Sequence, residues 1–209
     1  MKAVATLIGD VVASRAAPDR RRLHTDLVGV LDEVNSLTAP AQPLRVTVGD
    51  EFQGAWGRRG QALHAGLLLR LALLPDVETR YGLGWGEVAA LDDDGAVQDG
   101  PGWWAAREAI TRAKGDEAAV RSAGRTVRTR WHEEDPRGLA LDALVRHRDL
   151  LVAGLDERSV RLLRGLLAGR TQRALAEEEG VSPTAVSRRV HRDGLDQVVA
   201  IDADLGELP

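Results

Sequence analysis

The chain has 209 residues, which is enough for one large domain or for a main domain with a small appendage. Apolar residues make up 44% and charged residues 29%, so the chain can bury a sizeable core and is not expected to be disordered. The absence of cysteine excludes disulfides, thiolate metal sites and a cysteine nucleophile. The net charge of −4 means that any contact with nucleic acid must come from a local basic patch.

The beginning of the chain, MKAVATLIGDVVASR, carries no signal for secretion. It lacks a basic segment followed by a long apolar run and a small-residue cleavage site. No stretch reaches the roughly 18 apolar residues that a membrane span needs. We therefore expect a cytoplasmic protein that has no contact with a membrane.

The first 135 residues have the hydrophobic pattern of a β-α-β-β-α-β domain. Strands are expected at 3–8, 44–48, 51–56, 77–85 and 126–131, and helices at 18–37, 60–74 and 103–114. Residues 87–91 read as a continuation of the fourth strand or as its hairpin partner. This order is typical of an α+β fold with a ferredoxin-like or palm-like antiparallel sheet, and we assign it to residues 1–135.

Residues 136–209 read almost entirely as helices and form the second predicted unit, with the boundary between about 132 and 155. Part of this tail, at about 155–201, has the layout of a helix-turn-helix. Thr171 is placed to cap the first helix, and Gly180 follows it where a left-handed residue is needed. Ser182 and Pro183 then have the residue types that begin a second helix.

The second predicted helix has a local basic charge. Between Ser182 and Arg192 there are three arginines and no acidic residue. Arginines and hydroxyls are suitable donors to phosphates and base edges. The predicted DNA contacts are Ser182, Thr184, Ser187, Arg188, Arg189 and Arg192.

Two observations keep other interpretations of the tail open. The acidic run Glu177, Glu178 and Glu179 on the preceding helix would face away from DNA or repel it. The same two helices could instead form a hairpin that packs on the first domain or on a partner protein.

Two aspartates mark a candidate metal site in the front domain. Asp10 ends the first strand, and Asp50 lies in the turn of the hairpin VTVGDEFQGAW. A palm-like sheet would bring the two carboxylates together, and paired carboxylates hold Mg²⁺ beside a triphosphate. The predicted ligands are therefore Asp10 and Asp50, with Glu51 as a third. The alternatives are that Asp10 caps a helix or pairs with Arg15, and that Asp50 is an ordinary turn former.

The front motifs resemble the catalytic domains of class III nucleotide cyclases and of diguanylate (GGDEF) cyclases. The metal aspartates of those enzymes lie in a first strand and in a hairpin containing Gly-Asp, and GWWAAR at 102–107 resembles their motif G-x-V-N-x-A-A-R. This resemblance implies that Arg107 steadies the transferring phosphates. Trp103 stands where those enzymes have asparagine, which favours a nucleotide-binding or vestigial site over an efficient cyclase. The predicted nucleotide-binding and phosphate-binding residues are Arg15, Arg80, Arg107, Trp103 and Trp104.

At closer range the whole chain resembles the SatD family of bacterial proteins. The resemblance rests on IGDVVASR at 8–15, TVGDEFQGAW at 47–56, RYGLGWGEV at 80–88 and DGPGWWAAREAI at 99–110. The tail is similar to the helix-turn-helix of sigma-factor region 4. The family resemblance itself implies little chemistry.

The leading hypothesis is a cytoplasmic DNA-binding regulator whose front domain binds a nucleotide-type ligand or Mg²⁺. A homodimer is expected from the cyclase resemblance and from the two-fold symmetry common among helix-turn-helix proteins. One alternative is an enzyme, a Mg²⁺-dependent nucleotidyl cyclase or transferase. Another is a protein-interaction module whose tail binds protein instead of DNA.

Overall fold

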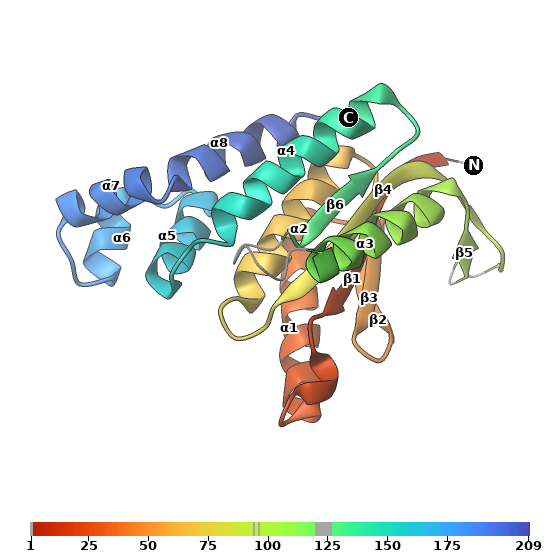
Figure 1. Cartoon of the computed structure of the whole chain (residues 1–209), viewed down its shortest axis with the longest axis horizontal. Coiled ribbons are helices and arrows are strands. Elements are labelled where there is room, and N and C mark those ends of the chain that lie inside the picture. Colours follow the sequence, from red (N-terminus) through yellow and green to blue (C-terminus); the bar gives the residue numbers. More distant parts are fainter. Residues whose placement is uncertain (1, 94, 96, 120–126) are drawn as a thin grey trace.

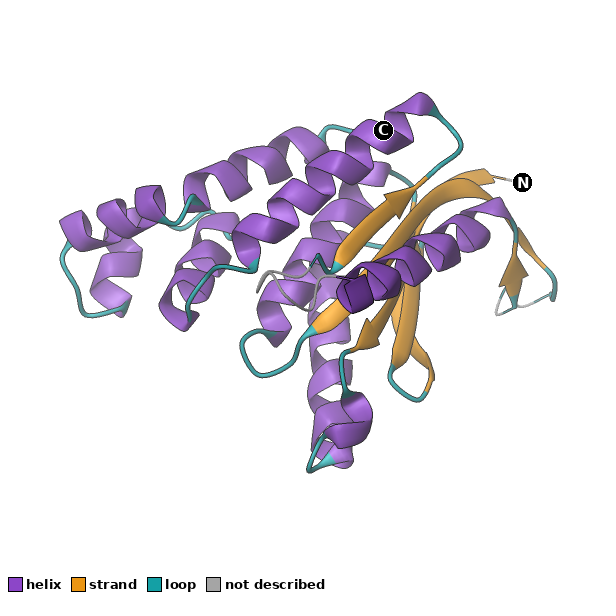
Figure 2. Cartoon of the chain, in the orientation of Figure 1, coloured by secondary structure: helices purple, strands orange, loops and turns teal. Residues whose placement is uncertain are grey.

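The computed structural model describes residues 2–93, 95, 97–119 and 127–209. Within these residues the chain forms six strands, eight α-helices and one short 3₁₀ turn (Figures 1 and 2). One part of the molecule is a sheet with helices on both faces, and the other is a group of helices alone. The predicted α+β class is confirmed.

The sheet has the strand order expected for a ferredoxin-like domain. Strands β2, β3, β1 and β4 lie side by side with antiparallel pairing throughout. Both β5 and β6 also pair with β4. The strands are β1 (Lys2–Val11), β2 (Gln42–Val48), β3 (Glu51–Trp56), β4 (Thr79–Ala90), β5 (Gln98–Asp99) and β6 (Thr129–His132).

Helices cover the sheet on both faces. In Figure 1, α3 crosses in front of the sheet and α1 and α2 lie behind it, while α5, α6 and α7 gather at the end of the molecule away from the sheet. The helices are α1 (Arg20–Thr38), α2 (Arg59–Leu73), α3 (Pro101–Ala119), α4 (Pro136–Val152), α5 (Glu157–Leu167), α6 (Gln172–Glu178), α7 (Pro183–Arg192) and α8 (Leu195–Gly206).

Strand β6 departs from the expected antiparallel sheet, because it pairs with β4 in parallel. The reason is the crossover: α3 returns the chain to the end of the sheet from which β4 started, so the next strand runs in the same direction. The strand that we expected from residue 126 begins at Thr129, and residue 126 itself lies outside the described residues. Residues 87–90 continue β4, which settles the choice left open by the sequence.

The face of β4 toward α3 is made of glycines. A Cβ atom on Gly82 would lie 2.2 Å from the backbone nitrogen of Ile110 and 2.3 Å from the carbonyl oxygen of Ala106. Comparable backbone clashes would arise at Gly84 and Gly86. The helix therefore lies directly on the strand, and this close approach fixes the position of every side chain on α3.

The tail helix α4 is attached to the sheet through two buried aspartates. Asp142 accepts a hydrogen bond from the backbone N–H of Trp131 at 2.9 Å and two more from the Arg130 side chain. Asp149 accepts from the backbone N–H of Thr129 at 2.9 Å and pairs with Arg70 of α2. Removing one partner of such a buried pair typically costs about 3–5 kcal/mol, so these contacts bind the tail firmly to the sheet.

The last helix, α8, is attached in the same way. Its buried Asp202 accepts one hydrogen bond from Arg148 at 2.8 Å and pairs with Nδ1 of His64 at 2.6 Å. Apolar packing joins the same parts, because Leu67 and Leu71 of α2 lie in one core cluster with the apolar residues of α5 to α8. A division of the chain at residue 135 stays a prediction.

We predict that Gly82→Ala destabilises the protein, because a methyl group would push against the backbone of α3 and force the helix off the strand. Overpacking of this kind costs about 1–3 kcal/mol and sometimes more. Urea unfolding followed by circular dichroism measures the change. The control is Gly115→Ala, on α3 itself, where nothing lies within 4 Å of the added Cβ. Equal unfolding midpoints for Gly82→Ala and the unmodified protein would contradict the packing described here.

Candidate functional site

A polar hollow of about 810 Å³ opens at the end of β1, beside the β2–β3 turn. We call it the strand-end hollow. Its charged lining residues are Asp10, Arg15, Arg20, Asp50, Glu51, Arg80 and Lys114. It therefore brings together five residues that the sequence predicted, namely the three carboxylates, Arg15 and Arg80.

Strand pairing builds the hollow. The antiparallel register of β1 with β4 places Asp10 directly opposite Arg80, and its register with β3 carries the β2–β3 turn to the same end of the sheet. Gly49 in that turn has a φ of +65°, a backbone conformation that favours glycine. The turn thus presents Asp50 and Glu51 toward the end of β1.

Asp10 is held by two cations. It is 8% exposed, and its carboxylate lies 3.0 Å from Nη1 of Arg80 and 2.5 Å from Nζ of Lys114. Arg80 in turn donates from Nε to Glu117 at 2.6 Å. The alternatives considered from sequence, a helix cap or a pair with Arg15, are not what the structure shows for Asp10.

Glu51 is also paired. Both of its carboxylate oxygens accept hydrogen bonds from Arg107 of α3, each at 2.7 Å. The hydrogen bonds and charge of Arg107 lower the pKa of Glu51, so this residue is a carboxylate at neutral pH. The contact brings Arg107 to the rim of the hollow, next to the residues that the cyclase resemblance grouped with it.

The hollow has unpaired cations but no assembled metal site. Among the described residues, Arg15 and Arg20 have no ion pair, and no group of three or more His, Asp or Glu side chains is arranged to hold a metal. A Mg²⁺ ion bound to Asp10 would have to displace Arg80 and Lys114. As arranged, the residues fit an anion such as a phosphate better than a bare Mg²⁺ ion.

The two tryptophans predicted to line the nucleotide site lie elsewhere. Trp103 is buried against Ile8 and Ile110 between α3 and the sheet. Trp104 is 60% exposed and donates its indole N–H to Asp99. The rise of an α-helix places them about 15 Å from Lys114 along α3, so neither lines the strand-end hollow.

Sequence reasoning missed two cations of the hollow, Arg20 and Lys114. Lys114 lies seven residues after Arg107, which is two helical turns and therefore the same face of α3. This spacing could have identified Lys114 as a neighbour of Arg107 from the sequence. Arg20 begins α1, and nothing in its local sequence distinguishes it from the neighbouring Arg21 and Arg22.

In the tail, helices α6 and α7 have the capping that the sequence predicted. Thr171 accepts a hydrogen bond from the N–H of Ala174, and Ser182 accepts one from the N–H of Ala185. Gly180 has a φ of +65°. The apolar residues Leu175, Ala176, Val186 and Val190 of these two helices are buried.

The arginines of α7 differ in their contacts. Nη1 of Arg189 contacts Asp156, the N-cap residue of α5, at 2.5 Å and Ser159 of α5 at 2.9 Å. This pairing holds the pKa of Asp156 well below its usual range. Arg192 pairs with Asp193 at 2.6 Å. Arg188 is exposed and has no ion pair among the described residues.

The acidic run on α6 is neutralised within the tail. Glu177 pairs with Arg173, and Glu178 pairs with Arg170. Glu179 receives hydrogen bonds from Arg158 and Arg161, and the contact with Arg161 lowers its pKa. The objection that these carboxylates would repel DNA is therefore weaker than the sequence suggested.

Among the described residues, no helix combines the length and the hydropathy needed to cross a membrane.

Comparisons with solved structures give distant likenesses. The guanylyl cyclase Cya2 is 13% identical, with 53% of this chain and 70% of that chain covered and a TM-score of 0.43. The adenylyl cyclase CyaB from P. aeruginosa is 13% identical, with 51% and 69% covered and a TM-score of 0.40. A regulator of polyketide synthase expression from Bifidobacterium adolescentis is 14% identical, with 99% and 81% covered and a TM-score of 0.33.

Curated protein sequences gave no significant match. The family model of the SatD family matches residues 4–199, which is nearly the whole chain. This chain therefore belongs to the SatD family.

Proposed function

We propose that this SatD-family protein is a cytoplasmic DNA-binding regulator whose front part binds a phosphate-bearing, nucleotide-type ligand. The observation that carries the proposal is the surface of α7. Its exposed residues Thr184, Ser187 and Arg188 form a polar face without ion pairs in the described part of the chain, while its apolar residues are buried against α5 and α6. In this reading α6 and α7 are a helix-turn-helix, and α7 enters the major groove.

The individual residues of α7 take different roles in this proposal. Arg188, Thr184 and Ser187 contact phosphates and base edges. Ser182 accepts from a backbone N–H as the cap, and its hydroxyl proton remains for a phosphate. Arg189, in contrast, holds α7 at a fixed angle to α5 through Asp156, so it positions the helix instead of reading DNA.

The strand-end hollow supplies the ligand site. Arg15 and Arg20 are unpaired in the described part of the chain, and Lys114 faces the same hollow. Guanidinium and ammonium groups that converge on one open site are suited to the charged oxygens of a phosphate chain. The ligand in this proposal is therefore a nucleoside phosphate.

A homodimer is part of the same proposal. Dimeric helix-turn-helix proteins place two recognition helices about 34 Å apart, one turn of DNA, and bind sites of matching two-fold symmetry. In a single copy of this chain, Arg188 is the one arginine of α7 without an ion pair among the described residues. Two copies would double that modest electrostatic contribution.

A Mg²⁺-dependent nucleotidyl cyclase or transferase is the second candidate function. It is favoured by Asp10 and Asp50, because both line the strand-end hollow. It is disfavoured by the two cations that hold Asp10 and by the burial of Trp103 away from the hollow. Consumption of ATP or GTP that stops in Asp50→Asn would establish the enzyme.

We predict that Arg188→Ala weakens binding to duplex DNA of any sequence, because one phosphate contact is lost. The negative slope of log K against log salt concentration should become shallower by about one. Fluorescence anisotropy over a range of salt concentrations measures both quantities. Arg189→Ala should instead lower the unfolding midpoint, since Asp156 loses its partner. The control is Arg137→Ala, an exposed arginine on α4. DNA affinity and slope unchanged by Arg188→Ala would contradict the assigned contact.

We also predict that ATP, GTP or inorganic triphosphate raises the melting temperature. A ligand at 100 times its dissociation constant stabilises by about 2.7 kcal/mol, which corresponds to several degrees in a chain of this size. Arg15→Ala with Arg20→Ala should remove most of the shift, whereas Arg21→Ala, beside Arg20 but outside the hollow, should keep it. If none of these anions shifts the melting temperature, the hollow is not a phosphate site.

A further inference from the structure

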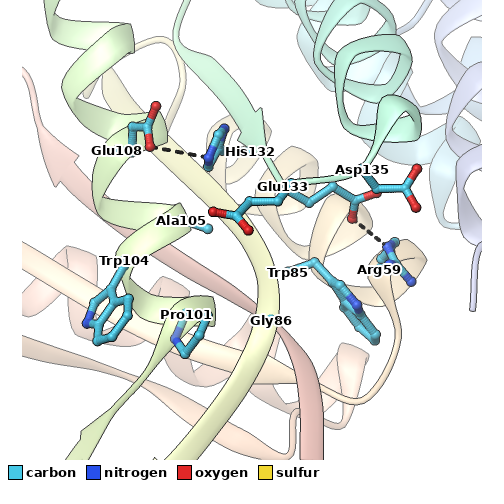
Figure 3. A pocket seen from close by; sticks show the side chains of 11 residues that line it. Arg59, Trp85, Gly86, Pro101, Trp104, Ala105, Glu108, His132, Glu133 and Asp135 are labelled. Carbon is cyan, nitrogen blue, oxygen red and sulfur yellow. Dashed lines mark hydrogen bonds and ion pairs between the residues drawn. The ribbon is translucent and has the colours of Figure 1, made fainter.

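A second pocket, of about 390 Å³, lies near the N-terminal end of α3, at the opposite end of that helix from the strand-end hollow (Figure 3). We call it the tryptophan pocket. Its side chains come from β4, α3, the start of α2 and the segment between β6 and α4. The lining residues that matter here are Arg59, Trp85, Trp104, Glu108, His132 and Glu133.

Two indoles form the sides of the pocket, with small residues between them. Figure 3 shows the indoles of Trp104 and Trp85 on either side of Pro101 and Gly86. A Cβ atom on Gly86 would lie 2.6 Å from the backbone nitrogen of Gly102, so the backbone of β4 is in direct contact with the start of α3 at this position. The hydrogen bond from Trp104 to Asp99, at 2.7 Å, fixes the orientation of the exposed indole.

The charge of the pocket is negative. Four carboxylates line it, and the cation among its described lining residues is Arg59. Nε2 of His132 contacts the Glu108 carboxylate at 3.2 Å. The four carboxylates are those of Glu108, Glu133, Glu134 and Asp135. Such a pocket repels phosphates and attracts cations.

Arg59 already shows which kind of cation the pocket accepts. Its guanidinium lies over the ring of Trp85, 3.8 Å from the centroid, and its Nε donates to Glu133 at 2.8 Å. The pocket also holds the indole of Trp104, which is 60% exposed, and the carboxylate of Glu108, which pairs with Arg112 and His132.

Glu133 provides an independent sign of a missing donor. The residue is only 7% exposed, and its Oε1 atom is buried with no hydrogen-bond partner among the residues that the structure describes. A buried hydrogen-bond acceptor without a donor lowers the stability of the folded state, and native structures rarely contain one. A bound group with N–H donors would satisfy it.

We propose that the tryptophan pocket binds an aliphatic organic cation, that is, a primary ammonium or guanidinium group carried on a short carbon chain. The cationic group would lie between Trp104 and the carboxylates of Glu108 and Glu133, with the carbon chain over Pro101. A bare metal ion is not the ligand, because no group of three metal-binding side chains occurs in the described residues. This inference does not depend on the proposed DNA or nucleotide binding.

Isothermal titration calorimetry with agmatine, which carries an ammonium and a guanidinium group, tests the proposal. Quenching or a shift of tryptophan fluorescence should accompany binding, since two indoles line the pocket. N-acetyl-arginine methylamide stands in for an arginine side chain of another protein. Tighter binding of agmatine identifies a free small molecule as the ligand, and tighter binding of the arginine derivative identifies a protein side chain. The uncharged 1-pentanol should not bind.

Trp104→Ala and Glu108→Gln should each weaken agmatine binding about two- to fivefold, because each removes one exposed contact with the cation. Both side chains are exposed, so the variants should fold. The matched controls are Leu139→Ala and Glu157→Gln, an exposed apolar residue and an exposed acid outside the pocket, and neither should change the affinity. The proposal is overturned if neither cation binds, or if Trp104→Ala and Glu108→Gln bind agmatine as tightly as the controls.

Discussion

The attachment of α4 to the edge strand β6 is the constraint on which the rest of the structure depends. A strand at the edge of a sheet leaves alternate N–H groups without partners. Here the N–H groups of Thr129 and Trp131 donate hydrogen bonds to Asp149 and Asp142. These two aspartates are seven residues apart and therefore lie on one face of α4. The same carboxylates bind arginines, so the edge of the sheet and the start of the tail form one buried network that fixes where α5 to α8 lie.

This network also reaches the strand-end hollow. Asp10 pairs with Arg80, Arg80 with Glu117, and Glu117 lies 3.0 Å from Nη1 of Arg128. The backbone N–H of Arg128 donates to Asp149 of α4. An anion that draws Arg80 or Lys114 away from Asp10 would therefore act on groups connected to the tail. This chain of contacts links the hollow to α4, and a change in affinity measures the coupling between them.

Much of this architecture was predictable from local signals. The caps at Thr171 and Ser182, the left-handed Gly180 and the strand order each follow from residue types at fixed spacings. That Asp10 and Asp50 would lie at the same end of the sheet followed from strand pairing alone, and both line the strand-end hollow. The ion pairs could not be predicted in this way. Nothing in the sequence around Arg189 indicates that it binds Asp156, 33 residues earlier. The tryptophan pocket was missed for the same reason, since its walls come from four separate segments of the chain.

In the regulator that we propose, a ligand in the strand-end hollow changes how tightly the tail binds DNA. The most direct measurement is the DNA dissociation constant of the chain, at low salt, without ligand and with saturating ATP or GTP. We predict that the ligand changes this dissociation constant and that bound DNA changes the affinity for the ligand by the same factor. In Arg15→Ala the ligand should no longer change the DNA dissociation constant, while the affinity for DNA without ligand should stay the same. A DNA dissociation constant that stays the same under ligand saturation, or an absence of DNA binding at low salt, would contradict it.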